Sequence, residues 1–255
     1  MIHNELLNSQ LISSIFDGEV EWIDSGFLNG AENMRFDEER ARNLVLGFAG
    51  PMLRVYGWKP WAVSLGANQK DSDINHVECE KRGFDIVRRA TGGRAVLHAD
   101  ELTYSVVLRI PEGISVHDIY RMTHERILAG LRTITPEIEF EKSQPNFSQV
   151  YKAQPQQTVA CFASSARYEI MHDGRKVVGS AQRVFGNVLL QHGSILLGAG
   201  HEQLADISAL RNGVQADSLR EYILSHSATL SEIVGRKVEF QEVAEAIRCG
   251  FLGLD

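Results

Sequence analysis

Cysteine is scarce in this chain, with three among 255 residues. Cys79, Cys161 and Cys249 lie far apart, with no C-x-x-C pair and no paired histidines nearby. This spacing is not that of a disulfide-stabilised domain, nor that of a zinc site. We therefore expect neither a disulfide framework nor a bound metal.

Long hydrophobic runs are also missing. Nowhere do roughly 18 apolar residues follow one another, which is about the length that a membrane-spanning helix needs. The segment from Met1 to Leu7 lacks the basic region and apolar run that together mark a secretory signal. These absences predict a cytoplasmic protein that does not contact a membrane.

An excess of positive charge is absent too, since the formal net charge is −7 at pH 7. A nucleic-acid-binding domain normally carries a basic face, so no nucleic-acid partner is expected. The stretch from Glu78 to Arg94 departs from this balance, because it holds five cations and three anions. This local basic region is suited to an acidic partner or a phosphate.

The chain is long enough, at 255 residues with 44% hydrophobic content, to build one sizeable core. Apolar residues that alternate or run together predict strands, and a period of 3.6 residues predicts helices. Strands are predicted at 20–24, 53–58, 61–65, 84–89, 94–98, 102–110, 138–140, 167–172, 175–183 and 188–197. Helices are predicted at 29–46, 74–82, 115–133, 218–225, 230–234 and 241–251.

A basic turn at Gly92-Gly93 is predicted to join two of these strands. Adjacent glycines leave backbone N–H groups open to a ligand, so an acyl carbonyl or a phosphate can approach the turn closely. Arg88, Arg89 and Arg94 crowd the same turn. A glycine pair alone is more typical of a plain hairpin, so its significance depends on the motifs that follow.

Cys161 and Lys176 are the candidate reactive pair. Cys161 lies near the end of segment 142–165, which is rich in Gln, Ser and Pro and predicts a long irregular loop. Asp173-Gly174 is a type I′ hairpin signal, and this hairpin could bring Lys176 beside the Cys161 loop. The lysine charge would there favour a thiolate or a developing oxyanion. From these residues alone, a buried inert thiol and an exposed lysine remain the ordinary alternatives.

The other cysteines and histidines are expected to be structural. Cys79 falls inside a predicted helix with nothing nearby to depress its pKa, and Cys249 is expected to be incidental. His117 and His124 share a face of one predicted helix but lack a carboxylate at ligand spacing. Packing or surface roles are therefore expected for both, and His192 is expected at most to cap its strand.

Four motifs, taken in sequence order, resemble the lipoate-protein ligase and octanoyltransferase family: Pro51–Trp58 with Ser64–Gln69, Arg88–His98, Gly174–Gln182 and His192–Leu196. The resemblance implies an α/β (α+β) fold of the biotin/lipoate ligase catalytic-domain type, with a mixed, largely antiparallel sheet flanked by helices. It also implies a single catalytic domain over residues 1–255. The stretch after Leu197 leaves little room for the C-terminal accessory domain that classical ligases carry.

Within that family, Ala160-Cys161-Phe162 followed by Gly174-Arg175-Lys176 is most similar to the cysteine-dependent octanoyl-acyl carrier protein:protein N-octanoyltransferases. The resemblance implies an acyltransferase of lipoate biosynthesis and protein lipoylation, with Cys161 carrying octanoyl as a thioester intermediate and Lys176 assisting it. It implies no cofactor beyond a phosphopantetheine-linked acyl donor. The implied substrate-binding residues are Arg88, Arg89, Thr91, Gly92, Gly93, Arg94, His98, Gly179 and Ala181.

The implied partners are acyl carrier protein and lipoyl-domain proteins, such as the glycine cleavage H protein and the acyltransferase subunits of 2-oxoacid dehydrogenases. Trp58, Trp61 and Val96 are expected to shape the acyl tunnel. His98 is the nearest candidate in the sequence for the base that deprotonates the acceptor amine. Asp100 departs from the family pattern, because many relatives place Asp directly after the histidine.

Three alternatives stay open. An ATP-dependent lipoate-protein ligase would use ATP and Mg²⁺, with Lys176 gripping the carboxylate and phosphate. An amidotransferase would move octanoyl from one lipoyl-domain protein to another. A non-catalytic module would bind an acyl carrier through the basic turn and form no covalent intermediate.

Overall fold

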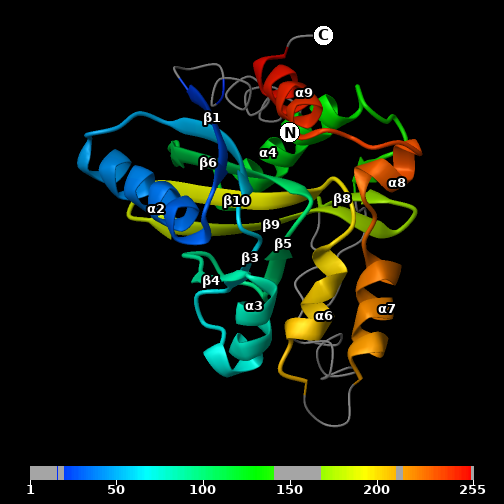
Figure 1. Cartoon of the computed structure of the whole chain (residues 1–255). Helices are drawn as coiled ribbons and strands as arrows, with labels where there is room; N and C mark the ends of the chain where they lie inside the picture. Colours follow the sequence, from blue (N-terminus) through cyan, green and yellow to red (C-terminus); the bar gives the residue numbers. More distant parts are fainter. Residues whose placement is uncertain (1–15, 17–19, 141–167, 211–214, 254–255) are drawn as a thin grey trace.

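Two β-sheets and their helices make up the fold in this computed structural model, which describes residue 16 and residues 20–140, 168–210 and 215–253. A 7-stranded main sheet has the order β1-β2-β6-β10-β9-β8-β7, and a 3-stranded small sheet has the order β4-β3-β5 (Figure 1). The strands are β1 (Glu21–Leu28), β2 (Met52–Trp58), β3 (Ala62–Leu65), β4 (Asp85–Arg88), β5 (Val96–His98), β6 (Glu101–Arg109), β7 (Glu139–Phe140), β8 (Ile170–His172), β9 (Arg175–Phe185) and β10 (Val188–Leu196).

The helices connect and cover these strands. In the main sheet β1 pairs parallel with β2, and the other pairings are antiparallel, which confirms the predicted mixed, largely antiparallel sheet. The helices are α2 (Gly30–Leu46), α3 (His76–Arg82), α4 (Val116–Leu131), α6 (Leu204–Ile207), α7 (Ala216–His226), α8 (Leu230–Val234) and α9 (Phe240–Leu252), with short 3₁₀ turns η1 (Asp71–Asp73) and η4 (His201–Gln203).

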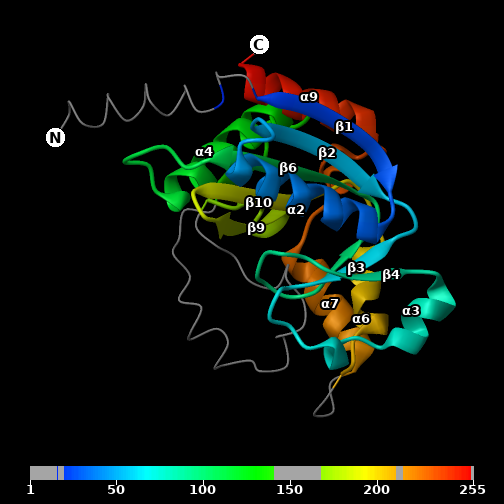
Figure 2. The same cartoon turned by 90° about the vertical axis from the view of Figure 1, so that its left-hand side faces the viewer.

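The main sheet is covered on both faces. Helices α4 and α9 pack on one face, and the residues between them and the sheet form the largest apolar core of the described chain. Helix α2 packs on the other face, where Ala41 and Leu44 contact Met52 and Val188. The small sheet lies on this second side together with α3, α6 and α7, which share a core of their own (Figure 2). The space between the two sheets is therefore lined by α2 and by strands of both.

Local capping residues explain where the longer helices begin and end. Asn29 forms a capping box with Glu32 at the start of α2, and Gly47 ends the helix at φ 82°. Ser115 forms the second capping box, with Asp118 at the start of α4. The predicted helices at 29–46 and 115–133 are confirmed because these end signals act within one turn.

The connection through Gly92-Gly93 differs from the plain hairpin that a glycine pair alone favours. Strands β4 and β5 do not pair with each other, because both pair with β3, β4 in parallel and β5 antiparallel. The loop between them crosses the end of β3 and lies directly on Gly66, where a Cβ atom would be 2.1 Å from the Gly93 oxygen. No hairpin forms here because β3, the pairing partner of both strands, lies much earlier in the chain, beyond the reach of turn patterns.

Two other local predictions, the turn at Asp173-Gly174 and a structural Cys79, agree with the structure. The turn at Asp173-Gly174 has φ of 47° and 72°, as the predicted type I′ hairpin requires. Cys79 is buried, and burial raises the pKa of its thiol to about 11, which agrees with a structural role. The short helical stretch from His201 to Ile207 was not predicted, because it is too short to show a period. The predicted loop at 142–165 lies outside the described residues.

Two negative observations apply to the described part of the chain. None of its helices combines the length and the apolar character needed to cross a bilayer. Nor do three or more His, Cys, Asp or Glu side chains gather there in a way that could hold a metal ion.

His124 joins α4 to the main sheet through a directed chain of hydrogen bonds. Burial lowers the pKa of His124 to about 4, so the ring is neutral at pH 7. Nδ1 lies 2.6 Å from the Tyr168 carbonyl oxygen and must donate to it, which leaves Nε2 to accept from Ser180 Oγ at 2.8 Å. The Ser180 oxygen in turn receives the Tyr104 hydroxyl at 2.6 Å. His124 therefore has a packing role that depends on its being neutral.

This arrangement predicts acid sensitivity. The pKa of His124 in the folded protein lies below the value near 6.5 in the unfolded chain, so the unfolded state alone gains a proton as the pH falls from 6.5 towards 4. The free energy of unfolding should therefore fall over that range, by about 3 kcal/mol from this residue. Urea unfolding of the His124→Asn variant, measured between pH 4.5 and 7.5, should show a flatter dependence on pH.

Tyr104→Phe is the matched control, because it removes a donor from the same chain of hydrogen bonds and leaves the histidine in place. It should lower stability by a similar amount at every pH in this range. Equal slopes for the wild type and His124→Asn would contradict the assignment of a neutral, buried His124.

Candidate functional site

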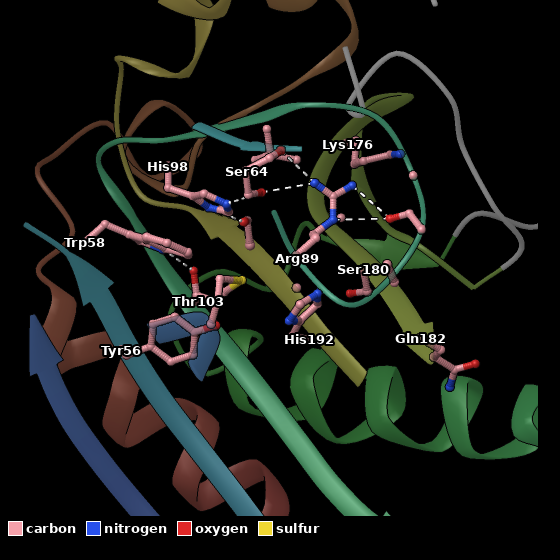
Figure 3. Close-up of a pocket in the computed structure, with 18 of the residues that line it drawn as sticks. Tyr56, Trp58, Ser64, Arg89, His98, Thr103, Lys176, Ser180, Gln182 and His192 are labelled. Atoms are coloured by element: carbon pink, nitrogen blue, oxygen red, sulfur yellow. Dashed lines mark hydrogen bonds between the residues drawn. The ribbon is translucent and has the colours of Figure 1, made fainter. Parts of the chain in front are cut away.

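A cavity of about 320 Å³ lies between the two sheets and is the candidate site. Its volume falls at the lower end of the range for small-ligand pockets, roughly 300–1,000 Å³. Tyr56 and Trp58 lie on one side of it and Lys176 and Gln182 on the other (Figure 3). The cavity thus has an aromatic side and a polar side.

Lys176 lies on the polar side and is almost fully buried, with 3% of its side chain exposed. Its Nζ is 2.9 Å from Oε1 of Glu169, which is also buried and also lines the cavity. A buried ammonium group is costly unless it is paired, so Glu169 is the counter-ion that permits Lys176 to lie here. Sequence reasoning missed Glu169 as a site residue, although an acidic residue just before a predicted hairpin with a lysine just after it was a usable signal.

The hairpin of β8 and β9 positions this ion pair. Met171 lies opposite Lys176 across the two strands, and a register shift between Ile170 and Met171 sets where Glu169 enters the sheet. Tyr168, which directly precedes Glu169, has φ of 69°, an uncommon value for a residue with a side chain. The hydrogen bond from His124 to the Tyr168 carbonyl oxygen holds this backbone in place.

Arg89 lines the cavity, and its side chain holds the loop at Gly92 and Gly93 through hydrogen bonds to backbone carbonyl oxygens. Its guanidinium donates to the carbonyl oxygens of Ser64 at 2.8 Å, Gly92 at 2.9 Å and Arg94 at 2.6 Å. Gly92 and Gly93 form part of the cavity wall, and Gly93 has φ of 98°. Arg89 therefore holds the loop in its shape, and the loop presents its glycines to the cavity.

Three of the other predicted binding residues do not line the cavity. Arg88 donates to the carbonyl oxygens of Gly66 and Gln69, each at 2.7 Å, and pairs with Asp71. Thr91 is fully buried behind the wall. Arg94 is absent from the lining, and only its carbonyl oxygen enters the network described above.

His98 does line the cavity, but both of its ring nitrogens are engaged. Nδ1 is 2.7 Å from Glu101 Oε1, and Nε2 is 2.8 Å from Ser64 Oγ. The ring also stacks on Trp58, with the centroids 4.0 Å apart and the planes 11° from parallel. No ring nitrogen is left to receive a proton from an acceptor amine, so this geometry does not favour His98 as the general base.

A buried ion pair supports the aromatic side from behind. Arg54 Nη1 lies 2.8 Å from Asp37 Oδ1, with 0% and 2% of their side chains exposed. Asp37 also accepts from the hydroxyls of Tyr56 at 3.0 Å and Ser105 at 2.9 Å. Burial alone would raise the pKa of Asp37, but His192 and Arg54 outweigh it and hold the pKa below the usual value. Asp37 is therefore ionised.

His192 connects this ion pair to the cavity wall. Its Nε2 is 2.6 Å from Thr91 Oγ1, and its Nδ1 is 3.7 Å from Asp37 Oδ2. Burial lowers the pKa of His192, so the ring is neutral at pH 7. His192 thus does more than cap a strand. Sequence reasoning also overlooked Asp37 and Arg54, although an arginine inside an otherwise apolar strand was a signal of a buried partner.

The remaining predicted residues fall into three groups. Gly179 and Ala181 line the cavity, as do Trp58 and Val96. Trp61 does not line it, because its ring packs beside Phe84 and Gly200. Cys161 lies outside the described residues, so its predicted closeness to Lys176 stays a prediction.

Asp100 lies away from the cavity. Its side chain covers Gly198, and its carbonyl oxygen accepts from the backbone N–H groups of Leu197 and Gly198, each at 3.0 Å. Partial burial raises the pKa of its carboxyl group. These contacts tie the start of β6 to the end of β10 and give Asp100 a structural position.

Comparison of the sequence with known proteins shows which family the chain resembles. Residues 29–252 match the family described as the lipoyl protein ligase A/B catalytic domain. Octanoyltransferase LipM of Symbiobacterium thermophilum is 37% identical over 242 residues, which cover 91% of this chain and 86% of that protein. Octanoyltransferase LipM of an Exiguobacterium species is 37% identical over 227 residues, covering 87% of this chain and 81% of that protein.

Solved structures share the fold. A lipoate-protein ligase A bound with ATP superposes with a TM-score of 0.71 at 22% identity, covering 92% of this chain and 85% of that one. A putative lipoate protein ligase from T. acidophilum with bound lipoic acid gives 0.71 at 21% identity, with the same coverage. The predicted fold type is confirmed, as is the predicted class of enzyme, an acyltransferase. The chain belongs to the lipoyl protein ligase A/B catalytic-domain family.

Proposed function

We propose that this protein transfers octanoyl from acyl carrier protein to a lysine of a lipoyl domain, through a thioester on Cys161. The observation that carries the proposal is the buried ammonium group of Lys176 on the polar side of a cavity whose other side is aromatic. Such a cavity suits an alkyl chain that ends in a reactive carbonyl. The relatives named octanoyltransferase LipM support the same acyl group.

The first step exchanges one thioester for another. The Cys161 thiolate attacks the carbonyl carbon of the donor, a new C–S bond forms, and the phosphopantetheine sulfur leaves and takes up a proton. A thioester is already activated, so this exchange needs no ATP and changes the free energy little. The octanoyl chain would then occupy the cavity.

Lys176 would serve this step in two ways. Its positive charge near Cys161 would lower the pKa of the thiol, and it would stabilise the negative oxygen of the tetrahedral intermediate. Glu169 holds the ammonium group at 2.9 Å, which keeps the charge fixed inside the cavity wall. Backbone N–H groups of the loop at Gly92 and Gly93 are candidate further donors to that oxygen.

The second step forms the amide. The neutral amine of the acceptor lysine attacks the Cys161 thioester, a C–N bond forms, the C–S bond breaks, and the amine proton ends on the departing sulfur. The amide is far more stable than the thioester, which gives the reaction its direction. Because both ring nitrogens of His98 are engaged, we expect another group to be the base that first deprotonates the acceptor amine.

The covalent intermediate is directly testable. Intact-protein mass after mixing with octanoyl-acyl carrier protein should rise by one octanoyl group, and hydroxylamine should remove it, because hydroxylamine cleaves thioesters. Cys161→Ser should show no hydroxylamine-labile octanoyl. Added ATP should change neither result, and octanoyl carried on a lipoyl domain should be the poorer donor.

Cys249→Ser is the matched control, because Cys249 is a partly exposed thiol that forms no disulfide and does not line the cavity. It should acylate like the wild type. Failure of the wild type to gain octanoyl mass would contradict the proposal, and so would ATP-dependent attachment of free lipoate by Cys161→Ala, which would instead indicate a ligase.

The Lys176–Glu169 pair gives a second prediction, which separates stability from chemistry. Lys176→Met leaves the Glu169 carboxylate buried without the compensating charge of Lys176, and breaking a buried ion pair typically costs about 3–5 kcal/mol of stability. The double variant Lys176→Met with Glu169→Gln removes both charges and should recover most of that loss. Both variants should form the acyl-enzyme about 10²-fold or more slowly, since the stabilising charge is gone.

Thermal unfolding and the rate of octanoyl gain, followed by mass, are the two measurements. Lys176→Arg keeps the charge on a bulkier head group and should retain more of the rate than either variant. Near-wild-type acylation by the double variant would show that Lys176 is structural.

A further inference from the structure

The aromatic side of the cavity is closed by a small number of apolar residues. Tyr56 and Trp58 of β2 supply the rings, and Met34 of α2 packs against both in one buried cluster with Ala62. Val96 and Ala181 are the other aliphatic residues in the described cavity wall. An acyl chain that begins near Lys176 would end against this cluster.

Tyr56 cannot recede to make room. It is fully buried, and the guanidinium of Arg54 lies 3.9 Å from the centre of its ring. Its hydroxyl donates to Asp37 at 3.0 Å. Any outward movement of the ring would break this hydrogen bond and disturb the buried ion pair behind it.

Trp58 is held just as firmly. Its Nε1 donates to Thr103 Oγ1 at 2.7 Å, and His98 stacks on its ring at 4.0 Å. Thr103 in turn donates to Glu101 at 2.6 Å. The two aromatic walls are therefore rigid.

The backbone that carries Met34 is fixed too. Gly30, one helical turn before it, lies so close to the small sheet that a Cβ atom would be 2.7 Å from Val87 Cγ1. The adjacent Asn33 donates from its side chain to the Gly57 carbonyl oxygen at 3.0 Å. Helix α2 is thus held to both sheets beside the cavity, and the side chain of Met34 is the part that can adjust.

Met34 differs from its neighbours in flexibility. Among the described residues that line the cavity, it is the one long, unbranched apolar side chain. A methionine side chain has three rotatable bonds and a soft thioether, so it fills whatever space its neighbours leave. The depth of the cavity at this point thus depends on one side chain.

We propose that Met34 determines the length of acyl chain that this enzyme accepts, by closing the cavity beside the rings of Tyr56 and Trp58. The inference rests on the proposed function in one respect, since an acyl chain has to enter the cavity. It adds a specificity-determining residue that lies on α2, outside the hairpin that carries Lys176.

Substitutions at Met34 should shift the preference in opposite directions. Met34→Ala removes three heavy atoms and should admit about two further methylene groups. Each buried methylene contributes about fourfold to binding, so the decanoyl-to-octanoyl ratio of kcat/KM should rise about 15-fold. Met34→Phe fills the same space with a larger, stiffer side chain and should raise the hexanoyl-to-octanoyl ratio by a similar factor of about 15, since these chains also differ by two methylene groups.

The experiment uses the full chain and a set of hexanoyl, octanoyl, decanoyl and dodecanoyl thioesters of acyl carrier protein, mixed so that they compete. Intact mass reads the distribution of acyl groups on the enzyme. A ratio taken within one sample does not depend on how much of a variant is folded. Met122→Ala is the matched control, because Met122 is buried in the main core and does not line the cavity; its distribution should equal that of the wild type.

A second measurement separates this inference from the proposed function. Calorimetry with free fatty acids of six to twelve carbons reads chain-length preference without any acyl transfer. If the wild type is not acylated, the proposed function fails, yet opposite shifts of the preferred fatty acid in Met34→Ala and Met34→Phe would still support the role of Met34. Wild-type preference in both folded variants, in both assays, would overturn it.

Discussion

The ion pair between Arg54 and Asp37 is the interaction on which the rest of the site depends. It joins β2 to α2 with a 2.8 Å contact that is almost wholly excluded from water. Tyr56 and Ser105 donate to the same carboxylate, and His192 lies against it. Removing either partner would leave an unpaired charge in the interior, at a cost of roughly 3–5 kcal/mol. Tyr56 of the aromatic wall, helix α2 and His192 therefore all depend on this ion pair.

A second buried pair, Lys176 with Glu169, lines the polar side of the cavity. The two ion pairs have different positions relative to the cavity. Arg54 and Asp37 lie behind the wall and give it rigidity, whereas Lys176 and Glu169 belong to the lining itself. On its aromatic side the cavity is bounded by the rigid rings of Tyr56 and Trp58 and by the flexible side chain of Met34. In the proposed function, this rigid framework would bind the alkyl chain and hold the Lys176 cation where the carbonyl reacts.

Several elements could be predicted from the sequence because their causes are local. Helix α2 begins at Asn29 and ends at Gly47 through contacts made within one turn, and the Asp173-Gly174 turn needs only its own backbone preference. Gly179 and Ala181, quoted from a motif, do line the cavity. The path of the glycine loop could not be predicted in this way, because β4 and β5 both pair with β3 and not with each other. Arg88 was predicted to be a binding residue from the family resemblance; its side chain donates to the carbonyl oxygens of Gly66 and Gln69 and does not line the cavity.

The sequence by itself determined the family, the succession of strands and helices, and the hairpin that carries Lys176, because motifs, caps and turns are properties of neighbouring residues. Only the tertiary structure decided which charges are buried and with whom. Asp37 and Arg54 are 17 residues apart, and Met34 meets Tyr56 and Trp58 from a different element. Which residue pairs with a buried charge, and which residues line a cavity, depends on how whole helices and strands pack. The pattern of residues in one segment does not identify the element that packs against it.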